Sequence, residues 1–159
     1  MTYLNQKEEG IKTLNQAIIM NFSNPNSWHF LALHHKEEKN YNQAMKCYLQ
    51  AIKNDPTNFN VLRDLSYLQL YLRQYYSFLE STRKGVDLRP GLAVNWVTYA
   101  FANYLTKNYE YAFKLLEACE KVVPVKPQEK NEIVLFRTHM LRLQNKNIEA
   151  IKFLEDNKK

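Results

Sequence analysis

The chain has 159 residues, of which 45% are hydrophobic and 24% charged. This composition is that of a globular protein and excludes an intrinsically disordered one. No stretch approaches the ~18 consecutive apolar residues that a membrane span needs, and the start, MTYLNQKEEG, lacks the apolar core of a signal peptide. We therefore expect a cytoplasmic protein without a membrane partner. The net charge of +6 favours acidic partners or RNA, but it identifies neither.

The sequence carries no pattern that indicates catalysis. Its three glycines, at positions 10, 85 and 91, cannot form a glycine-rich phosphate loop, and neither a nucleophile elbow nor an HExxH motif occurs. The two cysteines, Cys47 and Cys119, match no metal-ligand spacing, and we expect them to be reduced packing residues. We expect a chain that is not an enzyme, with no catalytic residue, metal, cofactor or small-molecule substrate.

The first predicted element is a helix within residues 1–22. Gly10, Leu14 and Ala17 each precede a matching residue of the next unit by one repeat period, which is about 34 residues. We expect this segment to be the second helix, helix B, of an incomplete repeat. Its helix A would lie before Met1, so we expect the chain to be a segment of a longer array.

Residues 25–56 carry the spacing of a tetratricopeptide repeat (TPR), a unit of two antiparallel helices, A and B. The signature starts at Trp28, and the residues at +3, +4, +16, +20, +23 and +28 are Leu31, Ala32, Ala44, Tyr48, Ala51 and Pro56. The small residues let the two helices approach closely, and the proline ends helix B. Asn24, Ser27 and Asn58 are candidate helix N-caps.

Two more units follow in the same register, at 59–90 and 93–124. They place the following residues at signature positions: Leu62, Leu65, Ser66, Pro90, Trp96, Tyr99, Ala100, Ala112 and Pro124. The unit at 59–90 is irregular, because Phe78 occupies a slot that holds alanine in its neighbours. Residues 129–159 predict a further helix pair, preceded by an insertion of about four residues around 125–128. The predicted fold is all-α: one right-handed solenoid of antiparallel helix pairs over 1–159.

The A helices of such an array line its concave face, where partners bind. From the register, this face should include His29, Leu33, Lys36, Arg63, Tyr67, Tyr71, Val97, Phe101 and Tyr104. An amphipathic helix of a partner protein would fit so apolar and aromatic a surface, although the protein's own repeats could cover it instead. Chaperone-binding TPR domains hold a terminal carboxylate with lysines and asparagines. The corresponding residues here argue against that role: His29, Leu33, Val94 and Thr98.

A basic stripe offers a second surface. It comprises Lys46, Lys53, Arg63, Arg73, Arg83, Lys84 and Arg89. Contacts from these residues to phosphates would be salt-sensitive and independent of sequence. The interleaved Tyr71, Tyr75 and Tyr76 could stack on bases, but packing is the favoured interpretation of their position.

Several stretches are more specific than a generic TPR. The tracts LRDLSYLQ at 62–69 and LRP at 88–90, followed by Trp96 and Tyr99-Ala100, resemble the auxiliary subunit of the N-terminal acetyltransferase A (NatA) complex. The resemblance extends from about residue 5 to 154 and corresponds to an early part of the longer family protein. It implies a scaffold that wraps a catalytic acetyltransferase, tunes its substrate choice and anchors it at the ribosome. The alternative is a peptide-binding TPR adaptor of another complex.

Overall fold

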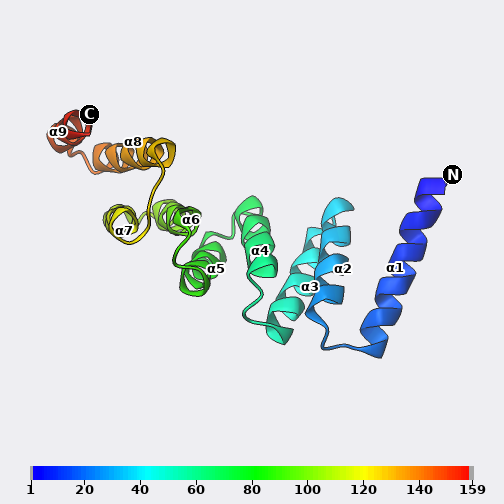
Figure 1. Cartoon of the computed structure of the whole chain (residues 1–159). Helices are drawn as coiled ribbons and strands as arrows, with labels where there is room; N and C mark the ends of the chain where they lie inside the picture. The colour runs from blue at the N-terminus through cyan, green and yellow to red at the C-terminus, as the bar shows by residue number, and fades with distance from the viewer. Residues whose placement is uncertain (1, 158–159) are drawn as a thin grey trace. The chain divides into compact units, whose positions relative to one another are not determined.

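The computed structural model describes the backbone of residues 2–157 and the side chains of residues 9–157. Met1 and residues 158–159, which the predicted ranges 1–22 and 129–159 include, lie outside the described residues. Within residues 2–157 the chain forms nine helices and no strand, so the predicted all-α class is confirmed (Figure 1). The helices are α1 Thr2–Met20, α2 Pro25–Glu37, α3 Tyr41–Asn54, α4 Phe59–Tyr71, α5 Tyr75–Leu88, α6 Ala93–Leu105, α7 Tyr109–Val122, α8 Pro127–Leu143 and α9 Asn147–Asp156.

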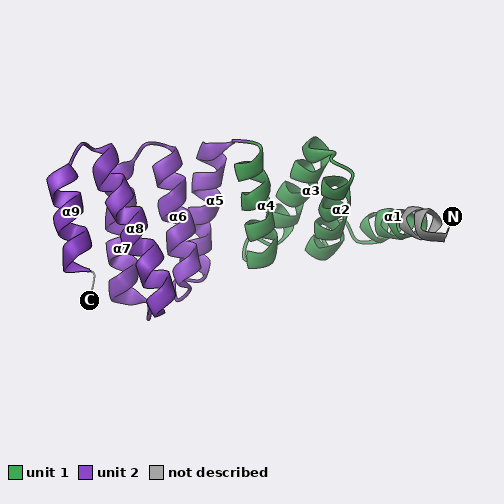
Figure 2. Ribbon diagram, turned by 90° about the horizontal axis from the view of Figure 1, so that it is seen from above, with its two compact units in different colours: residues 1–72 green, residues 73–159 purple. Residues whose placement is uncertain are grey.

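The helices group into two compact units, residues 1–72 and residues 73–159 (Figure 2). Unit 1 contains α1 to α4, and unit 2 contains α5 to α9. The boundary between the units falls between α4 and α5, inside the range 59–90 that the sequence assigns to one repeat. The division into repeats therefore stays a prediction, and the contacts below lie within one unit or the other.

A left-handed backbone residue ends the turn after α2, α4, α6 and α8. These residues, with φ between 58° and 65°, are Lys39, Arg73, Lys107 and Asn145. The first two intervals between them equal the repeat period, and the last interval is four residues longer. The left-handed backbone conformation is unfavourable for residues other than glycine. Their recurrence at the same point of the turn shows that the turn geometry determines them, whatever the side chain.

The four extra residues lie in α8, which has 17 residues where α2, α4 and α6 have 13 each. The sequence places them in an insertion before residue 129, whereas the structure adds them at the end of the helix. Helix α8 begins at Pro127, one repeat period after the start of α6, because proline suits the first helical position and the Glu129 carboxylate accepts a hydrogen bond from the Lys126 backbone N–H. The helix then continues for about one turn more than α6 before Asn145 turns the chain.

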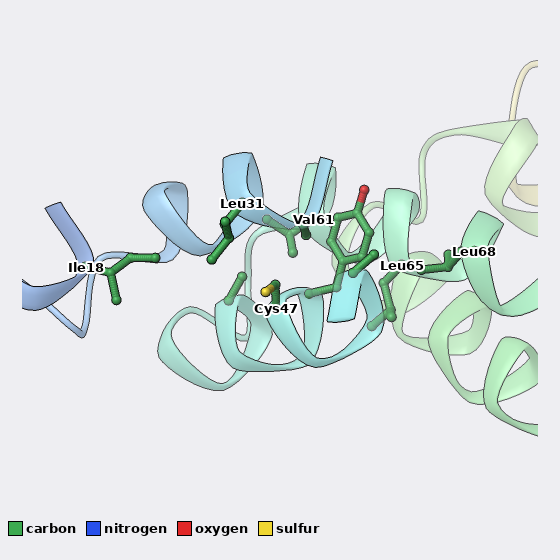
Figure 3. Close-up of a cluster of buried hydrophobic side chains, with 10 residues drawn as sticks. Ile18, Leu31, Cys47, Val61, Leu65 and Leu68 are labelled. Atoms are coloured by element: carbon green, nitrogen blue, oxygen red, sulfur yellow. The ribbon is translucent and has the colours of Figure 1, made fainter. Parts of the chain in front are cut away.

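The core of unit 1 lies between α1, α2, α3 and α4 (Figure 3). Ala32, Ala44 and Ala51 are fully buried where α2 meets α3, and a larger side chain there would force the helices apart. The apolar residues around these alanines include Ile18, Leu31, Cys47, Tyr48, Val61, Leu65 and Leu68. Asn24 caps α2 and Asn58 caps α4, as the sequence predicts, whereas Ser27 is buried in the first turn of α2.

The core of unit 2 lies around Ala100, Ala112 and Leu116, which are fully buried between α6 and α7. Ile133 and Met140 of α8 extend this core. The amide of Asn95 donates hydrogen bonds to the carbonyls of Gly85 and Arg89, at 3.1 and 2.9 Å. This side chain therefore ties the start of α6 to the end of α5.

Both tryptophans of the repeat signature are half-buried, and each indole N–H donates to a backbone carbonyl six residues earlier. Trp28 donates to Phe22 at 2.8 Å, and Trp96 donates to Pro90 at 2.7 Å. Equivalent residues thus make the same bond two periods apart. Of the other signature residues, the prolines are exposed, Tyr99 is half-buried, and the rest are buried: Leu31, Ala32, Ala44, Tyr48, Ala51, Leu62, Leu65, Ser66, Ala100 and Ala112.

Arg137 of α8 joins three helices of unit 2. Its guanidinium carbon lies 4.3 Å from the ring centre of Phe113 in α7 and 4.5 Å from that of Phe153 in α9. Its Nη1 donates to the Glu120 carboxylate of α7 at 2.5 Å. Burial lowers the pKa of Arg137, and the charges of Glu120 and Glu117 oppose that shift. The group is therefore a buried cation held by one carboxylate and two aromatic faces.

Candidate binding surfaces

Two residues predicted to face a partner, His29 and Arg63, both contact Asp64. The Nε2 atom of His29 in α2 lies 2.8 Å from Oδ2 of Asp64 in α4. Arg63 Nη2 lies 3.1 Å from the other carboxylate oxygen. The His29 side chain is 16% exposed, and Leu33 packs against the core of unit 1. His29 and Leu33 therefore make structural contacts, whereas 46% of the Arg63 side chain is exposed, and their place on a partner-binding face stays a prediction.

The remaining predicted residues of unit 1 form a small groove. A cavity of about 310 Å³ is lined by Lys36, Tyr41, Tyr67, Leu68 and Tyr71. The hydroxyl of Tyr41 donates to that of Tyr71 at 3.3 Å, and this bond is the main reason that the pKa of Tyr41 is raised. The groove therefore presents phenol hydroxyls and one lysine above an apolar floor. We name it the tyrosine groove.

The predicted residues of unit 2 belong to a second groove, between α6 and α8. Val97 and Phe101 line a cavity of about 400 Å³ together with Ala93, Val94, Glu129, Glu132, Ile133 and Phe136. We name it the α6–α8 groove. Tyr104, also predicted here, does not line the cavity. It stacks on Phe101, packs edge-on against Phe136 and hydrogen-bonds to His139 at 3.2 Å.

The residues that α8 contributes to this groove were not predicted. Glu129, Glu132, Ile133 and Phe136 share one face of α8, because residues spaced three and four apart lie above one another on a helix. The repeat period could have located them, since Phe101 lies against Phe136, the residue just beyond its equivalent one period later. An insertion before α8 would shift this register by four residues, so the predicted insertion does not lead to the pairing of Phe101 with Phe136. Tyr41 was also missed in the tyrosine groove, because it begins a B helix rather than lying on an A helix.

The structure divides the basic stripe between the two units. Lys46, Lys53 and Arg63 belong to unit 1, whereas Arg73, Arg83, Lys84 and Arg89 belong to unit 2. All seven side chains are exposed. Arg83 and Lys84 are adjacent on α5, whereas Arg73 and Arg89 lie just beyond its two ends, and the helix also carries the exposed acidic residues Glu80 and Asp87.

Other kinds of site are not evident in the described part of the chain. Residues 9–157 contain no group of three or more His, Cys, Asp or Glu side chains arranged to hold a metal ion. Among the described helices, none has the length and apolar character to cross a membrane. Cys47 and Cys119 are both buried, and burial raises the pKa of each thiol, that of Cys119 to about 11 with a contribution from Glu120 and Glu129.

Comparison with known proteins relates these helices to tetratricopeptide repeats and to NatA auxiliary subunits. Residues 25–58 match the tetratricopeptide repeat family. The chain is 31% identical over 156 residues to the human protein N-alpha-acetyltransferase 16, NatA auxiliary subunit, and the match covers 96% of this chain. It is 30% identical over 131 residues, or 82% of this chain, to the Arabidopsis thaliana N-terminal acetyltransferase A complex auxiliary subunit NAA15. This chain is a homologue of the NatA auxiliary subunits.

The NatA auxiliary subunits also share its fold. In the structure of Naa15/Naa10 bound to HypK-THB, the matching region has a TM-score of 0.80 and 26% identity, and it covers 98% of this chain and 24% of that one. The predicted TPR solenoid and the resemblance to the NatA auxiliary subunit are therefore confirmed. The chain spans 18% of the length of the human relative and 15% of the length of the plant relative.

Proposed function

We propose that this chain acts in a non-catalytic scaffold subunit of a protein N-terminal acetyltransferase complex and that this subunit binds the catalytic acetyltransferase. The observation that supports the proposal most directly is the continuous match to NatA auxiliary subunits over 96% of the chain. The shared fold agrees with it, because in the related structure Naa15 is assembled with Naa10 and HypK-THB. A helical repeat array suits a scaffold, since its surface is extended and open to large partners.

Affinity purification of the tagged protein, expressed from its own gene, tests this proposal. A small acetyltransferase should co-purify in a fixed ratio and acetylate the α-amino group of a peptide when acetyl-CoA is supplied. The same tag on an unrelated TPR protein is the control. Recovery of the protein without an acetyltransferase, under conditions that preserve complexes, would refute the scaffold role.

We further propose that the subunit contacts the ribosome through the basic surface around α5. Arg83 and Lys84 are exposed there, and cations that neutralise RNA phosphates release counterions, so binding weakens steeply as salt increases. Sedimentation with ribosomes at rising salt concentration should show this dependence. The double substitution Arg83→Gln/Lys84→Gln should lower the salt slope by about two. An unchanged slope would exclude this surface.

The tyrosine groove supports a second candidate function, a peptide-binding adaptor of another complex. Tyr67 and Tyr71 are 48% and 65% exposed, which is unusual for large side chains that pack within a repeat. A panel of partner peptides can distinguish the two functions. If the groove binds peptide, Tyr67→Ala should lower the affinity about tenfold, whereas Phe101→Ala, in the other unit, reports on the α6–α8 groove. Unchanged affinity in both variants would remove the adaptor function.

A further inference from the structure

The α6–α8 groove combines an apolar floor with an acidic edge. Val97 and Phe101 of α6 face Ile133 and Phe136 of α8 across a cavity of about 400 Å³. Glu129 and Glu132 stand at the edge that the first turns of α8 form. We propose that this groove docks a basic amphipathic helix of a partner protein, with apolar side chains on the floor and a lysine or arginine beside the two glutamates.

The acidic edge is the observation that identifies the charge of the ligand. The chain as a whole carries a net charge of +6, so two carboxylates flanking an apolar cavity run against its general charge. Glu132 forms no ion pair with any described residue, and it is exposed. Glu129 accepts a hydrogen bond from the backbone N–H of Lys126 through Oε2, which leaves its other oxygen for a ligand. An incoming cation would therefore meet carboxylates that form no ion pair with any side chain of residues 9–157.

The lysines near these glutamates are not part of the cavity lining. Successive residues of an α-helix are rotated by about 100°, so Lys130 lies about 100° around the helix from Glu129 and about 60° from Ile133. Lys130 is exposed and does not line the cavity, and neither does Lys126. The groove therefore presents the carboxylates without their sequence neighbours, which is the arrangement that attracts a basic ligand.

The dimensions of the groove indicate a short helix. Its lining on α6 extends from Ala93 to Phe101, which is about 12 Å along a helix that rises about 1.5 Å per residue. Two turns of a partner helix span this distance and place apolar side chains at i and i+4 on the floor. A cation one turn further along would then reach the acidic edge. This chemistry depends only on α6 and α8, so it holds whichever complex the chain serves.

Fluorescence anisotropy with two synthetic peptides tests the inference. The basic probe is a labelled helical peptide of about 14 residues with leucines at i and i+4 and lysines on the following turn, and the acidic probe has glutamates in place of the lysines. We expect the basic probe to bind at least about tenfold more tightly, which corresponds to about 1.4 kcal/mol. Affinity should decrease as salt increases, because the charges lie at the surface.

Two substitutions locate the binding site. Glu132→Lys should weaken the basic probe about tenfold and strengthen the acidic one, because a like charge replaces the opposite one. Val94→Arg, at a rim position that is 58% exposed, should weaken the basic probe without changing the fold. Glu155→Lys, an exposed site on α9 outside the groove, is the matched charge control and should leave both affinities unchanged. Circular dichroism and the thermal midpoint check that each variant is folded.

The outcomes are decisive in both directions. Preference for the basic probe that Glu132→Lys reverses and Glu155→Lys preserves would establish the docking site. Equal binding of the two probes, or no saturable binding up to about 1 mM, would overturn the inference. Preference for the acidic probe would also overturn it and would indicate that the exposed cations, such as Arg83 and Lys84, bind the peptide instead. Neither result would bear on the scaffold role, which co-purification of an acetyltransferase tests separately.

Discussion

Arg137 should be one of the most important single side chains for the stability of unit 2. We expect Arg137→Met to lower the free energy of unfolding by about 3 kcal/mol. Each aromatic contact of a desolvated guanidinium contributes about 1 kcal/mol, and Arg137 has two, with Phe113 and Phe153. Removing a buried cation from its carboxylate costs about 3–5 kcal/mol. The Glu120 side chain is 22% exposed, so water can replace part of that interaction and about 1–2 kcal/mol remains.

Urea unfolding followed by circular dichroism measures this change, and hydrogen exchange of α7, α8 and α9 locates it. Arg142→Met is the matched control, because Arg142 is exposed on the same helix; it should change stability by no more than about 0.5 kcal/mol. Arg137→Lys keeps the charge but loses the planar stack, so it should retain less than half of the stabilisation.

A double-mutant cycle isolates the ion pair between Arg137 and Glu120. Arg137→Met combined with Glu120→Gln should be about 1–2 kcal/mol less destabilising than the sum of the single changes. The reasoning would be refuted if Arg137→Met unfolded at the same urea concentration as the parent protein. If Arg137→Lys were as stable as the parent protein, only the proposed contribution of guanidinium stacking on Phe113 and Phe153 would be refuted, because the positive charge alone would then account for the stability.

Three further predictions concern the turns, the thiols and the repeated tryptophan bond. Lys107→Gly should stabilise the protein by about 0.5–1 kcal/mol in urea unfolding, since φ is 65° there, whereas Lys84→Gly within α5 should destabilise it by about 1 kcal/mol. Cys119 should resist thiol reagents at pH 8, because a pKa of about 11 leaves about one thiolate in a thousand. Its labelling should become fast only in denaturant, and fast labelling of the folded protein would contradict its burial. Trp28→Phe and Trp96→Phe should each cost about 1 kcal/mol of stability by losing an indole hydrogen bond, and unequal costs would show that the two bonds are not equivalent.

The sequence predicts the helices of this protein well because its repeat positions have a packing reason. Small residues such as Ala32 and Ala100 recur where two helices must touch, and both are fully buried. Asparagine caps such as Asn24 are local signals that depend on a few neighbouring residues. The repeat period combines these signals, so the helical class and the TPR fold can be predicted before any coordinates are known.

The end of α8 could not be predicted from the same signals. Ala150 takes the helix B position that Ala112 holds in the preceding unit, but it comes four residues later than one repeat period predicts. This spacing shows that four residues are added between the two positions, but not where they lie. The sequence around 140–143 contains no proline or glycine that would end the helix, so α8 continues, whereas Pro127 fixes its beginning. The number of residues between two repeat positions reveals an insertion. Only residues that begin or end a helix, such as proline or glycine, show whether the insertion lies in a helix or in a loop.

The binding surfaces stay a prediction, because a period identifies a face but not the contacts made across it. His29 and Asp64 are 35 residues apart, and so are Tyr104 and His139. In both cases a polar side chain on one A helix reaches the next A helix, one residue beyond the period, and is no longer available to a partner. Whether a residue on this face forms such a contact depends on the side chain about one period later. His29 lies beside the polar Asp64 and bonds to it. Val97 and Phe101 lie across from the apolar Ile133 and Phe136, and a cavity remains open between them. The surfaces most open to partners in such an array are therefore the stretches of adjacent A helices where complementary polar groups are lacking. Around Val97 and Phe101 this rule selects the α6–α8 groove over the surface around His29, although Tyr104 and His139 of the same two helices are paired.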